Sequence, residues 1–526
     1  MPYFTETKMS SDKQFTLFPY QQEHVQCIGE ILSGSQFAFD FSMLGTGKTY
    51  TASQIAIDLG VCHVIVVAPV SVLPKWKTMQ SMQIPIRELV SFCSLRSVIG
   101  KQPKHGLLER IDMKRKYGSR EVDAVEFKAS DRLKKMISEG ALIIIDEIQN
   151  IKNNSAQFHA VCEMLRPILS MDSSITTSRV LLLSGSPIDK EEQAARMFKT
   201  VGVMRAEELC KWHTSGRGVG YYDYTGYREI RVFCQSNNPD AYNVLEKKFK
   251  HLQLPWDVQH ALKMSFELFQ TCFKPLFSHA MKPIQMPVKL TKVNGYFTMN
   301  QTDAVRLSDA IMSLAKATRY DLQKQQVVYG TNSADTMRCI TIALMDIESA
   351  KIPLLERLVH DSLDTHERRK VIVCVNYRQS IDTLKSSLCD YNPLILDGTL
   401  SVKQRASVIE KFQMPSTKHR LLIGNFAVCS TGIDLDDKHG DYPRVMYANP
   451  QYNTITTYQL CHRVQRMDTR SDAEIYMVYG KTDNDTIMET SILNALARKG
   501  QVMRETVKEQ ATAGVLFPCD FPTYIE

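Results

Sequence analysis

The length, composition and charge of the chain exclude several classes of protein. It has 526 residues, of which 44% are hydrophobic and 23% are charged, as in globular proteins with more than one buried core. No apolar run is long enough to cross a bilayer, and the N-terminal segment is polar and lacks the apolar region of a signal peptide. The 13 cysteines form no Cys-x-x-Cys pair, which argues against a zinc module and a disulfide framework. The net charge of +7 is compatible with a polyanionic partner but does not specify one.

Six apolar runs rich in Val, Ile and Leu predict strands of parallel sheets that are buried on both faces. The runs are 64–69, 141–147, 179–186, 369–376, 419–426 and 474–480. Helical stretches separate them, which is typical of the α/β class. We therefore predict two α/β lobes, 17–203 and 341–512, with tails at 1–16 and 513–526. Residues 204–340 are rich in aromatic and basic residues without an alternating pattern, so we expect mostly helix and linker there.

A glycine-rich segment, Ser-Met-Leu-Gly-Thr-Gly-Lys-Thr at 42–49, predicts a phosphate loop. It follows the strand-like run 37–41 and precedes a helix-like run, which is the context that such a loop requires. Its glycines allow a tight turn that points backbone N–H groups at phosphate oxygens, and the helix N-terminus adds a positive dipole. Ser42 replaces the usual first glycine, and a simple glycine-rich turn before a helix is the alternative. We assign nucleotide binding to Gly45, Thr46, Gly47, Lys48 and Thr49.

Within the phosphate loop, two side chains carry the expected chemistry. Lys48 would reach the β- and γ-phosphates, and the Thr49 hydroxyl would hold magnesium. Asp146 and Glu147 end the run 141–147, at the sheet edge where ligands of open α/β sheets bind. Asp146 would help to hold magnesium, and Glu147 would orient or deprotonate the attacking water. Two acids that cap a following helix are the alternative, which is a poor one beside a phosphate loop of the same predicted sheet.

The segment 146–153, Asp-Glu-Ile-Gln-Asn-Ile-Lys-Asn, resembles the second helicase motif of the SWI/SNF-type DNA translocases of superfamily two. Further segments are similar to the other motifs of that family and follow in its order: 17–25, 64–76, 181–188, 396–412 and 449–466. The resemblance implies two tandem RecA-like lobes, the first binding ATP and the second the helicase C-terminal lobe, with a helical insertion between them. It also implies ATP and Mg²⁺ as cofactors, with Gln21 reading the adenine.

Some segments depart from the family pattern. Asp434 stands where the family has asparagine, and Tyr452 and Thr454 replace the Trp and Pro of its Trp-Asn-Pro element. Residues 274–282 resemble the end of the first lobe but lack its paired arginines, and 90–95 is an unusually early match to its Ile-Thr-Thr-Tyr-Glu element. These departures bear on the subfamily and on coupling, and they leave the ATPase core intact.

Arg463 and Arg466 are three positions apart and would share one face if their segment is helical. The family uses this pair as arginine fingers, and planar guanidinium groups suit the charge of a transferring phosphoryl group. A finger from another domain is worth about 10³–10⁵ in rate, so hydrolysis would depend on lobe closure. A solvated basic face with Asp468 nearby is the alternative.

The resemblance implies that double-stranded DNA lies across both lobes and is held mainly through its phosphates. Candidate contacts are Lys75 with Trp76, the turn 184–186 and the loop 430–432. A lone tryptophan is more often a core or rim aromatic than a base-stacking residue. The basic run 101–118 is more often a solvated loop than a groove-binding surface.

The leading hypothesis is a DNA-stimulated ATPase that tracks duplex DNA and remodels protein–DNA complexes. The alternatives are a strand-separating DNA or RNA helicase and a non-enzymatic scaffold, and the intact motifs argue against the scaffold. Because the chain is nearly all motor, we expect either that a partner protein supplies targeting or that the source genome is compact, as in bacteria or viruses. We expect an intracellular site of action, in a nucleus, a nucleoid or a viral replication site. His63, His105 and His279 lack metal-ligand spacing, so we interpret them as structural and expect no zinc.

Overall fold

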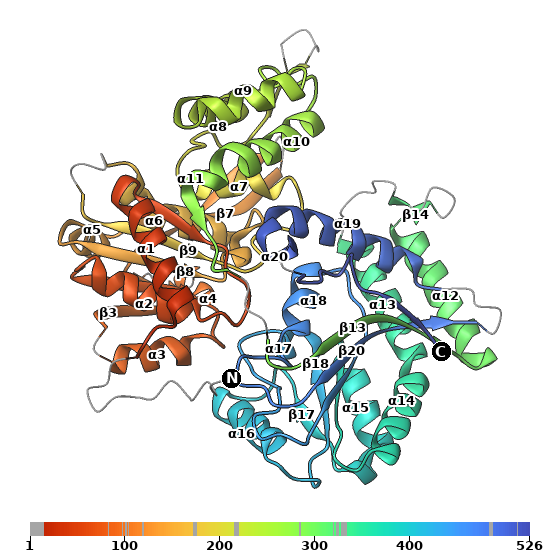
Figure 1. Ribbon diagram of the computed structural model, residues 1–526. Coiled ribbons are helices and arrows are strands. Elements are labelled where there is room, and N and C mark those ends of the chain that lie inside the picture. Colours follow the sequence, from red (N-terminus) through yellow and green to blue (C-terminus); the bar gives the residue numbers. More distant parts are fainter. Residues whose placement is uncertain are drawn as a thin grey trace. The chain divides into compact units, whose positions relative to one another are not determined.

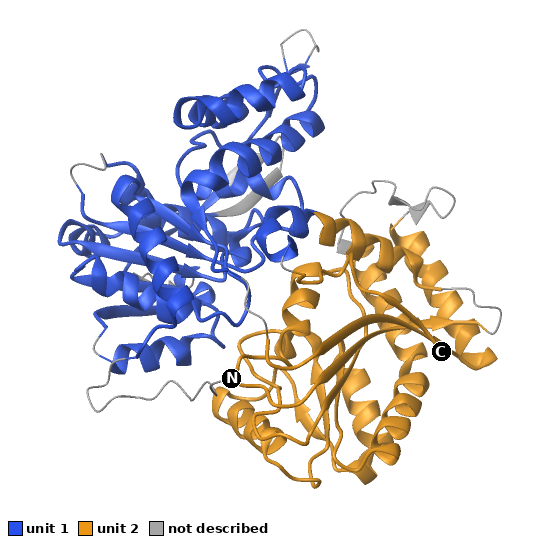
Figure 2. Ribbon diagram, in the orientation of Figure 1, with its two compact units in different colours: residues 1–283, 502–513 blue, residues 284–501, 514–526 orange. Residues whose placement is uncertain are grey.

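The computed structural model describes residues 15–526 apart from short segments at 83, 97, 100–101, 104, 118–119, 172–175, 215–219, 283–285, 319, 322–325, 328–333, 483–487 and 513. The chain divides into two compact units, which Figure 2 colours separately. Unit 1 comprises residues 1–283 and 502–513, and unit 2 comprises residues 284–501 and 514–526. Among the described helices, none has the length and apolar character needed to cross a membrane.

Unit 1 is built on a six-stranded parallel sheet in the order β12-β1-β9-β8-β2-β3. The strands are β1 (Phe37–Asp40), β2 (His63–Ala68), β3 (Ile86–Ser91), β8 (Ala141–Asp146), β9 (Arg179–Leu183) and β12 (Ser278–His279). Every residue of β1 and β8 is buried, so both faces of the sheet are covered at these strands. The apolar runs therefore form a RecA-like parallel α/β sheet, which confirms the predicted fold class.

Helices of unit 1 pack against this sheet (Figure 1). They are α1 (Pro19–Gly34), α2 (Lys48–Asp58), α3 (Leu73–Ser81), α4 (Phe92–Arg96), α5 (Asp131–Ser138), α6 (Ala156–Leu169) and α7 (Gln193–Thr200). One apolar core joins α1, α2 and α3 to β1, β2, β8 and β9, with Ile28, Ile55 and Trp76 among its buried members. The elements that carry the phosphate loop therefore share one core.

The basic run 101–118 is not a loop over most of its length. Residues Leu108–Tyr117 form β6, which pairs antiparallel with β7 (Arg120–Ala129). The register places Glu109 opposite Lys128, and opposite charges across a ladder favour pairing. Short strands β4 (Val98–Ile99) and β5 (Gln102–Pro103) precede this hairpin. The expectation of a solvated loop is wrong here, because this segment pairs with 120–129 in an antiparallel hairpin.

A helical insertion follows a small hairpin of β10 (Lys211–Thr214) and β11 (Gly220–Asp223). Its elements are α8 (Thr225–Asn237), α9 (Pro239–Lys248), α10 (Val258–Leu268), the π-helical turn η2 (Phe269–Phe273) and α11 (Lys274–Phe277). Phe273 anchors the insertion, with ring centroids 5.9 Å from Phe37 on β1 and 4.8 Å from Phe198 on α7. The structure thus confirms helix in this part of 204–340.

Unit 2 contains a seven-stranded parallel sheet in the order β17-β18-β16-β19-β20-β13-β21. The strands are β13 (Leu290–Thr298), β16 (Lys370–Val375), β17 (Leu394–Leu396), β18 (Leu421–Asn425), β19 (Arg444–Ala448), β20 (Ala473–Lys481) and β21 (Thr523–Ile525). The expectation of helix and linker is wrong for β13. Because β13 contains polar residues, its sequence did not predict a strand, but it pairs with β20 along nine positions.

The helices of unit 2 are α12 (Gln301–Thr318), α13 (Ala334–Ala350), α14 (Ile352–Thr365), α15 (Arg378–Ser387), α16 (Val402–Gln413), α17 (Phe426–Cys429), α18 (Thr454–Cys461) and most of α19 (Thr490–Thr506). Residues 502–513, with α20 (Lys508–Thr512), belong to unit 1, although we expected the second lobe to reach 512. Two contacts explain this: Glu509 accepts from Lys274 at 2.9 Å, and Gln510 donates to the carbonyl of Phe41 at 2.7 Å.

Candidate ATP site

The phosphate loop connects β1 to α2 and turns on two glycines in the left-handed region. Gly45 has a φ of 85° and Gly47 a φ of 93°, values that residues other than glycine rarely adopt. At Gly47 the space is closed as well, because a Cβ atom would lie 2.3 Å from Nε2 of Gln21. The sequence signal therefore corresponds to a backbone turn that requires glycine at both positions.

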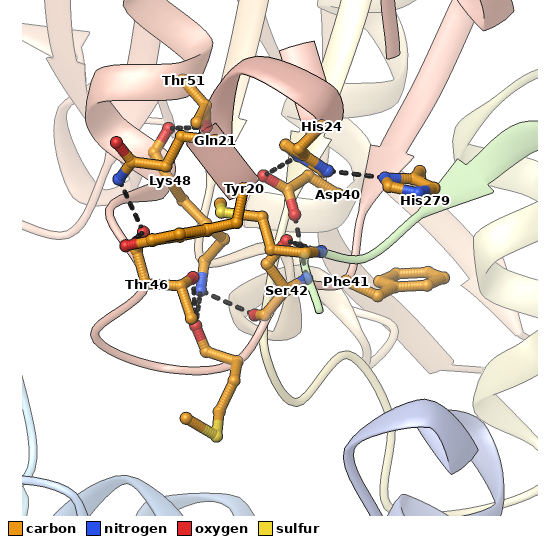
Figure 3. A network of polar contacts seen from close by, with 12 residues as sticks. Tyr20, Gln21, His24, Asp40, Phe41, Ser42, Thr46, Lys48, Thr51 and His279 are labelled. Atoms are coloured by element: carbon orange, nitrogen blue, oxygen red, sulfur yellow. Dashed lines mark hydrogen bonds and ion pairs between the residues drawn. The ribbon is translucent and has the colours of Figure 1, made fainter. Parts of the chain in front are cut away.

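Lys48 and Thr49 are the first two residues of α2, so they stand at the positive end of an 11-residue helix. The Lys48 Nζ donates to the carbonyls of Ser42 at 2.9 Å and Met43 at 3.1 Å, which places the ammonium group inside the loop (Figure 3). Thr49 is buried beside it. An anion at this helix end would meet unpaired backbone N–H groups and the lysine charge together.

Gln21 links helix α1 to the phosphate loop. Its Oε1 accepts from the backbone N–H of Phe18 at 3.0 Å, and its Nε2 donates to the carbonyl of Thr46 at 2.9 Å. Tyr20 approaches the same carbonyl with its hydroxyl at 3.5 Å. Gln21 therefore holds the loop in place, and its predicted reading of adenine stays a prediction.

Asp146 ends β8 at the carboxyl edge of the sheet, where the phosphate loop also lies. Its carboxylate is buried and accepts from the indole N–H of Trp76 at 2.8 Å. Burial, together with the neighbouring Glu147, raises the pKa of Asp146 to about 6, against the lowering effects of Trp76 and Lys48. A buried carboxylate whose charge is this poorly compensated fits a divalent cation, and with the Thr49 hydroxyl it offers the oxygen ligands that Mg²⁺ prefers.

Glu147 adopts a backbone conformation that is uncommon for a residue with a side chain. Its φ of 63° and ψ of 57° lie in the left-handed region, a conformation that costs about 1–3 kcal/mol where the surrounding structure imposes it. It begins the 3₁₀ turn Ile148–Ile151, and its carboxylate accepts from the amide of Gln149. Strain of this kind concentrates at functional sites, which supports a catalytic interpretation of Glu147.

The serines expected to contact DNA are instead buried. Ser184 donates from its hydroxyl to Oε1 of Gln149 at 2.7 Å, and both Ser184 and Ser186 are fully buried. They connect the end of β9 to the acidic motif within unit 1. In unit 2, Ser430 is also fully buried and its carbonyl accepts from Arg463. The hydroxyls of these serines are therefore not displayed to a DNA phosphate.

Trp76 is the residue whose role sequence analysis missed. It is fully buried in the core of unit 1, so it cannot stack on a base, while the adjacent Lys75 is exposed. Its contact with Asp146 joins residues 70 positions apart, so no local sequence pattern predicts this contact. Trp76 therefore fixes the orientation of Asp146 instead of contacting DNA.

The two arginines of unit 2 do not share a helical face, because α18 ends at Cys461. The Nε of Arg463 donates to the carbonyl of Ser430 at 2.8 Å, and the Nε of Arg466 pairs with Oδ1 of Asp434 at 2.7 Å. Although burial opposes its charge, the pKa of Asp434 is lowered by Arg466 and Lys438. The aspartate that departs from the family pattern is thus the ion-pair partner of Arg466.

Two RecA-like sheets, a glycine-rich loop after β1, and a buried aspartate followed by a glutamate at the end of β8 are the features of a P-loop ATPase of the helicase type. The family model described as the helicase conserved C-terminal domain matches residues 350–468. This segment is accordingly similar to the C-terminal domain of helicase-family ATPases.

Similar proteins include viral and cellular nucleic-acid enzymes. A mimivirus protein from Acanthamoeba polyphaga mimivirus, named as a candidate ATP-dependent RNA helicase, is 22% identical over 89% of this chain and 80% of its own length. The DNA repair and recombination protein RAD54 of Saccharomyces cerevisiae is 28% identical over 24% of this chain and 14% of its own length. The human RAD54-like protein is 31% identical over 20% of this chain and 14% of its own length. A solved SWI2/SNF2 ATPase core of Sulfolobus solfataricus in complex with dsDNA aligns over 95% of this chain and 93% of that one, with a TM-score of 0.31 and 15% identity.

Replacing Asp146 with asparagine should raise the melting temperature of unit 1 in protein free of nucleotide and magnesium. A carboxyl whose pKa is raised on folding destabilises the fold fully above its folded pKa of about 6, and not at all below its unfolded pKa of about 4. The gain should therefore be full at pH 7.5 and vanish as the pH falls from 6 to 4. Each kcal/mol corresponds to about 2–4 °C in a unit of this size.

Differential scanning calorimetry across this pH range measures the effect, with the exposed Glu192→Gln as a control that should change little. A lower melting temperature at pH 7.5, or a gain that does not depend on pH, would show that Asp146 is not under electrostatic strain.

Proposed function

We propose that the chain is an ATP-dependent translocase on double-stranded DNA that remodels protein–DNA complexes. The observation that carries the choice of DNA is the similarity of part of the chain to RAD54 proteins from yeast and human, whose names denote DNA repair and recombination. The order of the motifs along the sequence supports the same choice. The assignment of the track is therefore an inference from partial relatives and motif order.

The phosphate loop and the acidic pair would carry out ATP hydrolysis. Lys48 would neutralise the β- and γ-phosphates, and Thr49 and Asp146 would hold Mg²⁺, which when bound offsets phosphate charge. Glu147, beside Asp146 at the same sheet edge, would orient the attacking water and accept its proton. The support for these roles is that the four residues end or begin elements at one edge of the unit 1 sheet.

Arg463 and Arg466 would act on the transferring γ-phosphoryl group, so that hydrolysis and movement are coupled. The guanidinium group has five N–H donors, so Arg466 would offer a terminal nitrogen to the phosphate while its Nε keeps the contact with Asp434.

A strand-separating helicase that uses RNA or DNA is the second candidate. The mimivirus relative favours it, because its name denotes an RNA helicase and its similarity spans 89% of this chain. The two candidates differ in the polymer that stimulates ATP turnover, which makes them separable by one assay.

Lys48→Ala should lower ATP turnover by at least about 10²–10³-fold, because it removes the charge that faces the phosphates. Circular dichroism and melting should stay close to wild type. The exposed Lys134→Ala on α5 serves as the matched control, with wild-type turnover expected. Wild-type turnover in a folded Lys48→Ala protein would reject the phosphate-site assignment.

Glu147→Gln should separate nucleotide binding from chemistry. The amide keeps the shape of the side chain and cannot accept the proton of water, so turnover should fall by about 10²–10⁴-fold while ATP binding persists. Fluorescent-nucleotide titration and a phosphate-release assay measure the two quantities. Loss of ATP binding with the amide in place would make Glu147 a structural residue.

ATP turnover should rise with duplex DNA and respond little to single-stranded RNA. Because contacts to phosphates dominate non-specific binding, the affinity for duplex should fall steeply with salt and ignore base sequence. Turnover with no nucleic acid, duplex DNA, single-stranded DNA and RNA, each at two salt concentrations, provides the comparison. Stimulation by RNA without stimulation by duplex DNA would favour the helicase alternative.

A further inference from the structure

A chain of buried polar groups lies directly behind the phosphate loop (Figure 3). Asp40 ends β1, and its carboxylate is 1% exposed. Its Oδ1 accepts from the backbone N–H of Ser42 at 2.8 Å, and its Oδ2 lies 3.0 Å from Nε2 of His24. His24 comes from α1 and is 0% exposed. Asp40 therefore joins α1 to the first residue of the phosphate loop.

His24 also contacts a second histidine. Its Nδ1 lies 2.7 Å from Nδ1 of His279 on β12, so one proton must lie between the two nitrogens. Three arrangements satisfy this contact together with that to Asp40. Both rings are neutral and His279 donates, or His279 is protonated and donates, or His24 is protonated and donates to both His279 and Asp40. When both rings are protonated, two N–H groups oppose each other and the contact is broken.

The network reaches Lys48 through Ser42. The Ser42 hydroxyl accepts from the backbone N–H of Met281 at 2.8 Å, and its carbonyl accepts from Nζ of Lys48 at 2.9 Å. Although burial opposes its charge, the pKa of Asp40 is lowered to about 2 by His24 and Lys48, so the carboxylate is charged at neutral pH. Ser42 is thus held by Asp40 on one side and by the end of β12 on the other.

The members of this network coincide with departures from the family pattern. His279 lies in the segment 274–282 that lacks the paired arginines, and Ser42 stands at the position of the first glycine of the loop. These two positions meet His24 within one chain of polar contacts, although His24 and His279 are 255 positions apart. Because these residues contact one another, we interpret the substitutions as parts of one network.

We propose that His24, Asp40 and His279 are positioning residues for ATP hydrolysis, which hold Ser42 and thereby the carbonyl that Lys48 contacts. Turnover then requires that the two histidines together carry no more than one extra proton. The proposal rests on the role of Lys48 in ATP hydrolysis proposed above.

The charged groups around His24 and His279 indicate that acid conditions would break the contact between the two rings. Asp40 faces it from β1, Glu23 from α1, Lys282 from the segment after β12, and Lys48 from α2. Glu23 and Lys282 pair with each other at 2.7 Å, so their charges offset one another. Burial and the neighbouring His24 lower the pKa of His279, which keeps its ring neutral at physiological pH. Acid is therefore the condition that would add a second proton to the pair.

The test compares the pH profile of kcat for ATP in the full chain and in two variants of His279. His279→Asn keeps a non-titrating polar group toward His24, so it should retain turnover at pH 7.5 and lose the acid limb that wild type shows. His279→Leu removes the partner and should lower kcat about tenfold at every pH, the size expected for one lost hydrogen bond to a charged group. His63→Asn, on a histidine of the same unit outside the network, should leave the profile unchanged.

Asp40→Asn provides a second measurement if the His279 variants fold poorly. The amide oxygen can still accept from Ser42, but the missing negative charge disfavours protonation of the histidines. The acid limb should therefore move to lower pH, accompanied by lower kcat.

Each outcome decides the proposal. An unchanged acid limb in His279→Asn, or wild-type kcat and KM in His279→Leu, would overturn it, because a merely structural role would alter melting without altering the profile. Active Lys48→Ala would instead reject the proposed function of the loop. An inactive Lys48→Ala with an unchanged His279→Asn profile would reject the positioning role alone.

Discussion

The unit 1 site depends on one constraint, the burial of a carboxylate at the end of β8 beside the phosphate loop. Asp146 is oriented by Trp76, and its burial and the neighbouring Glu147 both oppose its negative charge. Such an arrangement is costly without a cation, and the proposed Mg²⁺ and nucleotide would offset that cost. The proposed function thus requires a site that lowers the stability of the free protein.

The features that local sequence determines could be predicted. The phosphate loop needs glycine at positions 45 and 47, because both residues have a positive φ. A continuous apolar run such as β8 predicts a buried parallel strand, and Asp146 lies at its end. Predictions that needed a partner distant in sequence failed. The sequence of β13 is partly polar, so only its pairing with β20 identifies it as a strand. The charged segment β6 is likewise identified as a strand by its pairing with β7.

The same limit applies to the site. The resemblance to the family made Trp76 a candidate for DNA contact, and its bond to Asp146 does not follow from neighbouring residues. Arg463 and Arg466 would share one face only if their segment were helical, but α18 ends at Cys461, and Asp434, the partner of Arg466, lies on a separate loop. His279, interpreted as structural from spacing, meets His24 through the pairing of β12 with β1. Tertiary contacts of this kind connect the motifs of such an ATPase, and motif order alone does not reveal them.

The central claim is that ATP hydrolysis moves the protein along intact duplex DNA. Displacement of a third strand from a triplex tests it most directly, with a forked duplex in parallel. We predict ATP-dependent displacement of the third strand, absent in Lys48→Ala, while the fork stays paired. Efficient ATP-dependent unwinding of the fork without displacement from the triplex would contradict the claim and assign the chain to the strand-separating helicases.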